Sequence, residues 1–142
     1  MIEKLTIHEL KKGALEQDFK NLSYWLQTKG YHSKNICEEY IDFIKESNGG
    51  IFTCGKREYQ FLSLKEIVEY YEIYNFSVYM PLALPFAMDG SGNYYLFDMR
   101  NESNNIYGVH SGNIGWADDE CFFIANSFTE MLEQKTLLDE SH

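Results

Sequence analysis

The chain has 142 residues, of which 44% are hydrophobic and 16% aromatic, a composition that predicts one folded domain and excludes a disordered chain. Its 22 acidic and 12 basic side chains give a net charge of −10, whereas nucleic-acid binding requires positive charge, so we expect no direct nucleic-acid contact. No apolar run approaches the roughly 20 residues of a transmembrane helix, and we expect no membrane partner.

The cysteines Cys37, Cys54 and Cys121 lie far apart and are odd in number. The N-terminus is amphipathic and lacks the apolar segment of a signal peptide. Both features favour reduced thiols and a cytoplasmic location.

The negative charge is unevenly distributed along the chain. Residues 1–57 contain 9 basic and 8 acidic side chains, a net charge of +1, whereas residues 58–142 contain 3 basic and 14 acidic side chains, a net charge of −11. An acidic surface attracts basic partners, and it also keeps a protein in solution. Composition alone leaves both interpretations open.

The first predicted elements are helical and lie before residue 35. Thr6 and Glu9 have the spacing of a capping box, in which a hydroxyl and an acidic side chain bond backbone N–H groups at a helix N-terminus. We therefore expect one or two helices in this region.

A further helix is predicted within residues 33–50. Apolar residues recur there at helical spacing, and Asn-Gly-Gly at residues 48–50 ends the helix, because glycine adopts the left-handed conformation of a helix C-terminus. The expected buried face consists of Ile36, Tyr40, Phe43, Ile44 and Ser47.

Capping signals predict two more helices. Ser63 and Glu66 form a capping box before the first of them, and Ser127 and Glu130 repeat it before the second. The residues expected to face inward are Leu64, Ile67, Val68 and Tyr71 in one helix and Phe128, Met131 and Leu132 in the other.

Strands are predicted between and after these helices, in short runs rich in aromatic and β-branched residues. Proline lacks a backbone N–H, so Pro85 places its run at a sheet edge or lies among the first residues of a strand. The expected strands are residues 51–54, 58–62, 84–89, 93–99, 105–110 and 120–125. This order predicts an α+β fold, a single domain over residues 1–142 with a mostly antiparallel twisted sheet packed against several helices.

The segment Asp89-Gly-Ser-Gly-Asn begins like a calcium-binding loop of the EF-hand type. Such a loop needs glycine at its sixth position and a bidentate glutamate at its twelfth, where this chain has Tyr94 and Arg100. We therefore expect no metal site and no cofactor. We expect a β-hairpin, in which Gly90 and Gly92 take positive φ angles and Asp89 bonds the turn backbone.

Three blocks of the chain resemble one known family. They are EEYIDFIKESNGG at residues 38–50, LPFAMDGSGNYYLFD at residues 84–98 and IANSFTEMLE at residues 124–133. In sequence and order they resemble the SMI1/KNR4 family, also called the SUKH superfamily, and the resemblance covers residues 36–133. It implies the fold of that family, which agrees with the predicted α+β architecture.

The resemblance also implies a function through protein binding. Many bacterial members of the family are immunity proteins that neutralise a cognate toxin, often a nuclease, and other members are regulatory or scaffold proteins. The acidic C-terminal part fits the first role, because a nuclease is basic where it binds phosphate and an acidic inhibitor can cover that surface.

The best candidates for partner contact lie in the segment GWADDE. Trp116 is a residue type enriched in binding hot spots, and Asp118, Asp119 and Glu120 place like charges in a row. Asp89, at the hairpin turn, is a further candidate. The alternatives are a core tryptophan beside a solvated loop and, for Asp89, a purely structural turn residue.

Enzymatic signatures are weak. The four histidines are scattered outside any metal-binding motif. Cys121 and His110 are a conceivable nucleophile pair, although cysteines in apolar strands are usually inert. Asp98 and Arg100, two residues apart in one strand, predict a structural ion pair.

We therefore expect a non-enzymatic cytoplasmic immunity protein, a monomer or weak homodimer, that binds a basic nuclease-type toxin and covers its active surface. One alternative is a regulatory or scaffold protein without a toxin partner. Another is a small hydrolase, which would need a pocket with convergent polar groups.

Overall fold

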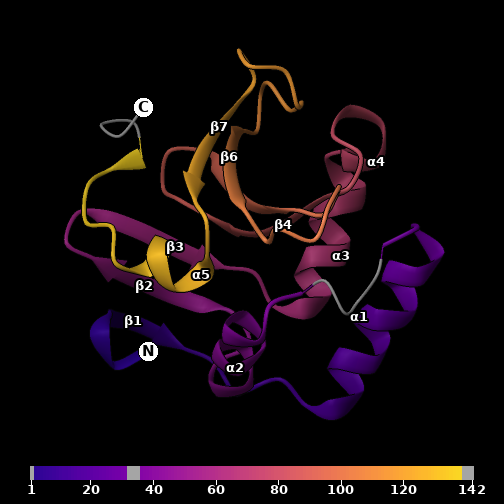
Figure 1. The fold of residues 1–142 in the computed structure, drawn as a ribbon. Helices are drawn as coiled ribbons and strands as arrows, with labels where there is room; N and C mark the ends of the chain where they lie inside the picture. The colour runs from indigo at the N-terminus through magenta and orange to yellow at the C-terminus, as the bar shows by residue number, and fades with distance from the viewer. Residues whose placement is uncertain (1, 32–35, 139–142) are drawn as a thin grey trace.

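Seven strands form one antiparallel sheet whose spatial order follows the chain (Figure 1). The structure is a computed structural model that describes residues 2–31 and 36–138. The strands are β1 (Thr6–Leu10), β2 (Gly50–Cys54), β3 (Arg57–Phe61), β4 (Ala83–Met88), β5 (Asn93–Asp98), β6 (Ile106–His110) and β7 (Cys121–Ala125). The helices are α1 (Glu16–Thr28), α2 (Glu38–Glu46), α3 (Leu64–Ile73), α4 (Phe76–Tyr79) and α5 (Phe128–Leu132), with the 3-10 helix η1 (Ile2–Lys4). The predicted α+β fold is confirmed.

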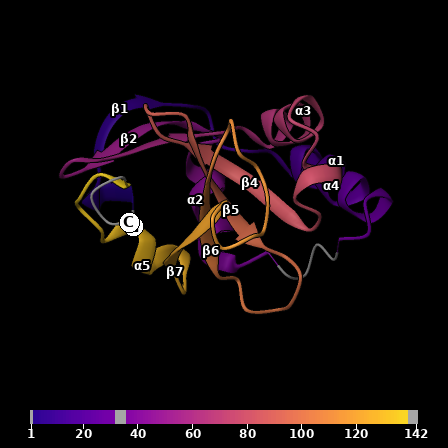
Figure 2. The same cartoon turned by 90° about the horizontal axis from the view of Figure 1, so that it is seen from above.

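Both faces of the centre of the sheet are covered. On one face, which we call the α2 side, the ring of Phe97 in β5 lies 5.2 Å from that of Tyr40 in α2. On the other face, the α4 side, the ring of Tyr94 lies 5.6 Å from that of Phe76 in α4. Figure 2 shows α3 and α4 across β4 and β5 from α5. Every residue of β5 is consequently buried.

The capping signals locate two helices correctly. Ser63 Oγ accepts a hydrogen bond from the backbone N–H of Glu66 at 3.1 Å, and the Glu66 carboxylate accepts from the Ser63 N–H at 2.9 Å. Ser127 Oγ accepts from the N–H of Glu130 at 3.1 Å. Helices α3 and α5 begin directly after these serines, because the caps satisfy N–H groups that have no partner within the helix.

The helix predicted within residues 33–50 is α2. Tyr40 and Phe43 are each only 1% exposed, as expected for its buried face. Gly49 follows the helix with a φ of 101°, which only glycine adopts without strain. Residues 33–35 of the predicted segment lie outside the described residues.

The helix predicted to begin at Thr6 is wrong, because residues 6–10 form the edge strand β1. Thr6 pairs with Thr53 and Leu10 with Gly50 in an antiparallel ladder, and the His8 ring lies 2.9 Å from the Thr53 hydroxyl. The capping spacing is present, but no apolar helical stripe follows it, and pairing with β2 decides the conformation. The one α-helix described before residue 31 is α1, which begins later, at Glu16.

The placement of Pro85 at a sheet edge is also wrong, since β4 lies between β3 and β5. Only Met88 and Ala87 of β4 pair with β3, opposite Gln60 and Phe61. Pro85 lies earlier in the strand, outside that ladder, so its missing N–H removes no hydrogen bond to β3. The alternative expectation, a proline near the beginning of its strand, agrees with the structure.

Replacement of Tyr40 by phenylalanine is expected to raise the free energy of unfolding by about 1 kcal/mol, because the buried hydroxyl has no hydrogen-bond partner among the described residues. Tyr59 is a matched control, since its hydroxyl donates to the carbonyl of Met131 at 2.6 Å. Tyr59→Phe should instead lower the free energy of unfolding by about 1 kcal/mol. Urea denaturation of both variants measures the difference, and a destabilised Tyr40→Phe protein would contradict the expectation.

Candidate functional site

Asp89 lies in the turn between β4 and β5, and its carboxylate bonds the turn itself. Oδ1 accepts hydrogen bonds from the backbone N–H groups of Ser91 and Asn93 at 2.9 and 3.0 Å, and Oδ2 accepts from the Asn93 side chain at 3.0 Å. The predicted hairpin is confirmed. Contact between Asp89 and a partner stays a prediction. Both oxygens of the Asp89 carboxylate already accept hydrogen bonds within the turn.

The expectation of a positive φ angle holds for Gly92, at 84°, but is wrong for Gly90. Gly90 lies close to β3 instead, where an added Cβ would be only 2.5 Å from a carboxylate oxygen of Glu58. A side chain at Gly90 would therefore displace Glu58 or the turn.

Trp116 packs onto the α4 side of the sheet. Its Nε1 donates a hydrogen bond to the carbonyl oxygen of Pro81 at 2.7 Å. Its ring lies 5.8 Å, edge to face, from the ring of Tyr107 in β6 and 3.7 Å from the guanidinium carbon of Arg100. Trp116 therefore connects the loop of residues 111–120 to the segment that follows α4.

Arg100, beneath this tryptophan, is held in place by Asp98. Its Nε and Nη2 donate to the two carboxylate oxygens of Asp98, each at 3.0 Å. The Asp98 side chain is only 4% exposed, and its hydrogen bond raises the pKa of Arg100. The predicted ion pair is confirmed, and its bidentate geometry makes it stronger than an ordinary exposed pair.

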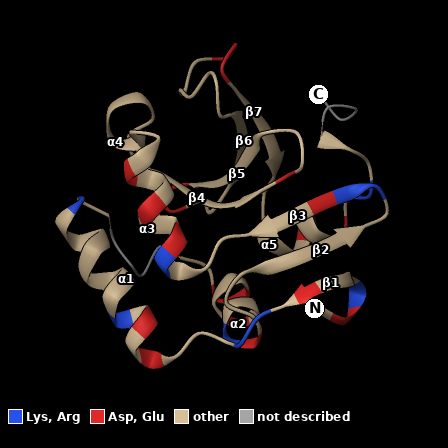
Figure 3. Ribbon diagram, turned by 180° about the vertical axis from the view of Figure 1, so that it is seen from behind, with Lys and Arg blue, Asp and Glu red and all other residues tan. Residues whose placement is uncertain are grey.

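The acidic residues lie at the end of the same loop. Figure 3 marks acidic residues in red there, before β7, and along α3. Asp118 and Asp119 are exposed and have no ion-pair partner among the described residues, whereas Glu120 is half-buried and accepts a hydrogen bond from the N–H of Ala117 at 3.1 Å. Trp116 and the acidic residues are thus brought together by one loop. Asp89 is not among them. It precedes β5, whereas Arg100, which Trp116 contacts, follows the other end of that strand.

The segment around α4 was missed by sequence reasoning. Val78 and Tyr79 are 70% and 59% exposed, although both are large and apolar. The segment is bounded by Asn75 and Leu82, whose φ angles of 54° and 65° lie in the left-handed region. Strained backbone of this kind often occurs at functional sites. The Trp116–Pro81 hydrogen bond places this segment beside the acidic loop.

A cavity of about 420 Å³ lies between α4 and the loop. Its lining residues are Tyr74, Tyr79, Ser111, Gly112, Asn113, Ile114 and Glu120. We use the term acidic aromatic surface for the residues Val78, Tyr79, Trp116, Asp118, Asp119 and Glu120. Aromatic side chains beside unpaired carboxylates are suited to binding a basic protein.

Replacement of Asn75 by alanine is expected to lower the free energy of unfolding by about 1 kcal/mol, because alanine is more strained at this φ angle than asparagine. The Asn75 side chain forms no capping hydrogen bond, so only the backbone effect is tested. Asn75→Gly is the control and should remain within about 0.5 kcal/mol of the wild type. Equal losses in both variants, measured by urea denaturation, would argue against strain at this position.

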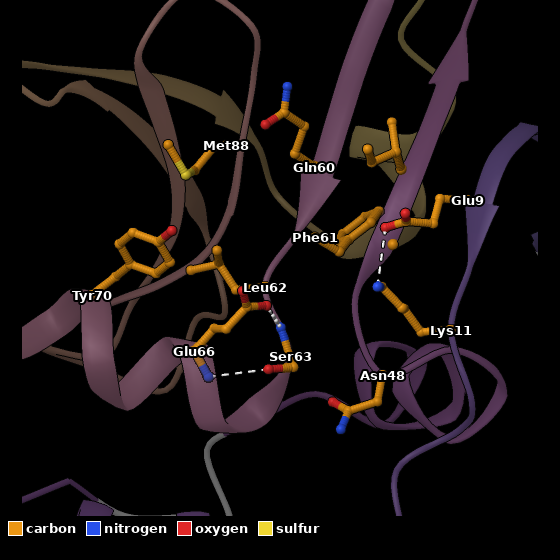
Figure 4. Close-up of a pocket in the computed structure, with 12 residues that line it drawn as sticks. Glu9, Lys11, Asn48, Gln60, Phe61, Leu62, Ser63, Glu66, Tyr70 and Met88 are labelled. Carbon is orange, nitrogen blue, oxygen red and sulfur yellow. Dashed lines mark hydrogen bonds and ion pairs between the residues drawn. The ribbon is translucent and has the colours of Figure 1, made fainter.

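A second cavity, also of about 420 Å³, lies between α3 and strands β1 to β3 (Figure 4). Most of its polar side chains already have structural partners. Ser63 and Glu66 cap α3, the Asn48 side chain accepts from the Leu64 N–H at 2.9 Å, and Glu9 pairs with Lys11 at 3.3 Å. This cavity therefore offers few uncommitted polar groups for catalysis.

Reactive side chains do not converge in the described part of the chain. Val109 pairs with Cys121 across β6 and β7, so the adjacent His110 faces the opposite side of the sheet from Cys121. Burial raises the pKa of Cys121, and it raises that of Cys37 to about 11. Within residues 2–31 and 36–138, no group of three or more His, Cys, Asp or Glu side chains could hold a metal ion.

Comparison with known proteins assigns the chain to a family. The model of the SMI1 / KNR4 family (SUKH-1) matches residues 35–134. The chain belongs to the SMI1/KNR4 family. A search of curated proteins found no match. The resemblance seen in the sequence is confirmed, and this SMI1/KNR4 family is associated with immunity proteins, which suggests a protein partner.

The SMI1/KNR4 match includes the whole acidic aromatic surface, whereas β1 and α1 precede it. No helix among the described residues of this SMI1/KNR4 protein is both long enough and apolar enough to cross a membrane.

Proposed function

We propose that this protein is a non-enzymatic immunity protein of the cytoplasm that binds a basic, nuclease-type toxin and covers its active surface. Family membership supports a role of this kind. The observation that carries the proposal is the acidic aromatic surface, in which exposed tyrosine and half-buried tryptophan adjoin unpaired carboxylates.

The two kinds of residue in this surface have different roles in binding. Asp118 and Asp119 accelerate the encounter with a basic partner, because their field acts over a Debye length of about 8 Å at physiological salt. Tyr79 and Val78 supply apolar area that becomes buried in the complex. Contacts of this type are the ones that dominate affinity when water is excluded around them.

Neutralisation requires no chemistry by this protein. A nuclease binds phosphate through basic side chains, so a complementary acidic surface that occupies those side chains blocks the substrate. Replacement of substrate by a tightly bound protein is sufficient to abolish activity.

The test is co-purification with the protein encoded next to this one, followed by titration at low and high salt. We expect an equimolar complex whose dissociation constant rises with salt, and loss of the partner's nuclease activity on binding. Absence of a complex, or a complex that leaves the nuclease active, would contradict immunity. A salt-sensitive complex with a cellular protein instead would favour the regulatory or scaffold role.

A further inference from the structure

One wall of the cavity between α4 and the 111–120 loop is backbone whose N–H groups already have acceptors. The backbone N–H of Ser111 donates to the Gly92 carbonyl at 2.9 Å, that of Gly112 donates to Nδ1 of His110 at 3.0 Å, and that of Asn113 donates to the His110 carbonyl at 2.9 Å. All these N–H groups are therefore occupied. A backbone anion site is built from free N–H donors, and residues 111–113 supply none.

The same cavity presents acceptor and aromatic groups. Glu120 is the one charged residue in its described lining, and Oε1 of this residue accepts the Ala117 N–H, while Oε2 has no hydrogen-bond donor among the described residues. Tyr74 and Tyr79 supply aromatic rings, and the Tyr74 ring is fixed by an edge-to-face contact with Tyr94 at 5.3 Å. A carboxylate beside tyrosine rings is the arrangement that binds a cation.

We propose that this cavity receives an arginine side chain of the partner protein. A guanidinium group is planar, stacks on tyrosine rings and donates to a carboxylate with more than one N–H, which suits Tyr79, Tyr74 and Glu120 better than the compact ammonium of lysine. At about 420 Å³ the cavity lies in the lower part of the size range of ligand pockets and has room for a single long side chain. Asp118 and Asp119, which directly precede Glu120 in the loop and are exposed, add to the negative potential around it.

This inference rests on the proposed function but is tested without a toxin. The probe is the blocked tripeptide Gly-Arg-Gly, titrated into isotopically labelled protein and followed by the NMR signals of Tyr79, Gly112 and Glu120. Gly-Lys-Gly is the chemical control. The protein variants are Glu120→Gln, which keeps the acceptor for the Ala117 N–H, and Glu130→Gln, which removes one exposed negative charge on α5.

We expect saturable shifts confined to the cavity with the arginine peptide, and binding at least about fivefold weaker with Glu120→Gln but unchanged with Glu130→Gln. Equal binding of the lysine peptide, equal weakening by both variants, or absence of cavity shifts would overturn the arginine assignment. If a toxin complex forms but the arginine peptide causes no NMR shifts at the cavity, this inference alone would be overturned. Peptide binding without any toxin complex would instead count against the proposed function.

Discussion

Substitution of both Asp118 and Asp119 by lysine is expected to slow association with a basic partner by about tenfold or more at low salt. The reversal changes the charge at the exposed end of the loop from negative to positive, and neither carboxylate has an ion-pair partner among the described residues. Stability should change little, because both side chains are exposed. Stopped-flow mixing with the purified partner at low and high salt measures the effect.

A matched control separates local attraction from net charge. Glu46→Lys with Glu133→Lys makes the same change in net charge at exposed positions on the last turn of α2 and just after α5, where lysine is compatible with the helix dipole. We expect a clearly smaller change in association rate for this control. If both double variants slow association equally, the acidic aromatic surface is not the contact region.

Replacement of Phe128 by alanine is expected to lower the free energy of unfolding by about 4 kcal/mol. Phe128 is fully buried at the beginning of α5, and its ring lies within about 6 Å of the rings of Tyr40, Phe43 and Phe61. Alanine would leave a cavity where the sheet, α2 and α5 meet. Urea denaturation with an unchanged m value measures the loss.

Phe123 is the control for this substitution. It lies on the edge strand β7 and is 41% exposed, so Phe123→Ala should cost no more than about 1 kcal/mol. Similar losses at both positions would mean that the aromatic cluster around Phe128 is not the centre of the core.

The elements that the sequence predicts well are those set by nearby residues. The structure contains the serine caps of α3 and α5 and the glycine after α2. Each of these residues affects only the backbone within a few residues of its own position. Strands β2 to β7 follow from short runs rich in aromatic and β-branched residues for the same reason. Local signals of this kind are sufficient when tertiary contacts agree with them.

The predictions that failed depend on distant partners. Residues 6–10 contain a helix-capping spacing, yet they pair with β2, forty or more residues away along the chain. The interior position of Pro85 could not be inferred, because it depends on how far the ladder between β3 and β4 extends. Propensity is a weak guide wherever an edge strand offers backbone hydrogen bonds.

The candidate site was only half predictable for a related reason. Trp116 and the acidic residues are adjacent in the chain, so composition identified them together. The contribution of α4 depends on the hydrogen bond between Trp116 and Pro81, which are 35 residues apart, and on left-handed backbone at Asn75 and Leu82. Residues 78–79 resemble core residues in the sequence, and only the structure shows them exposed.

Growth of cells that produce the neighbouring gene product tests the central claim most directly. We expect the wild-type protein to restore growth, and the Asp118→Lys, Asp119→Lys variant to protect measurably less at equal abundance. Failure of the wild-type protein to protect would contradict the immunity function. Full protection by the variant would contradict the assignment of the acidic aromatic surface as the site of toxin binding.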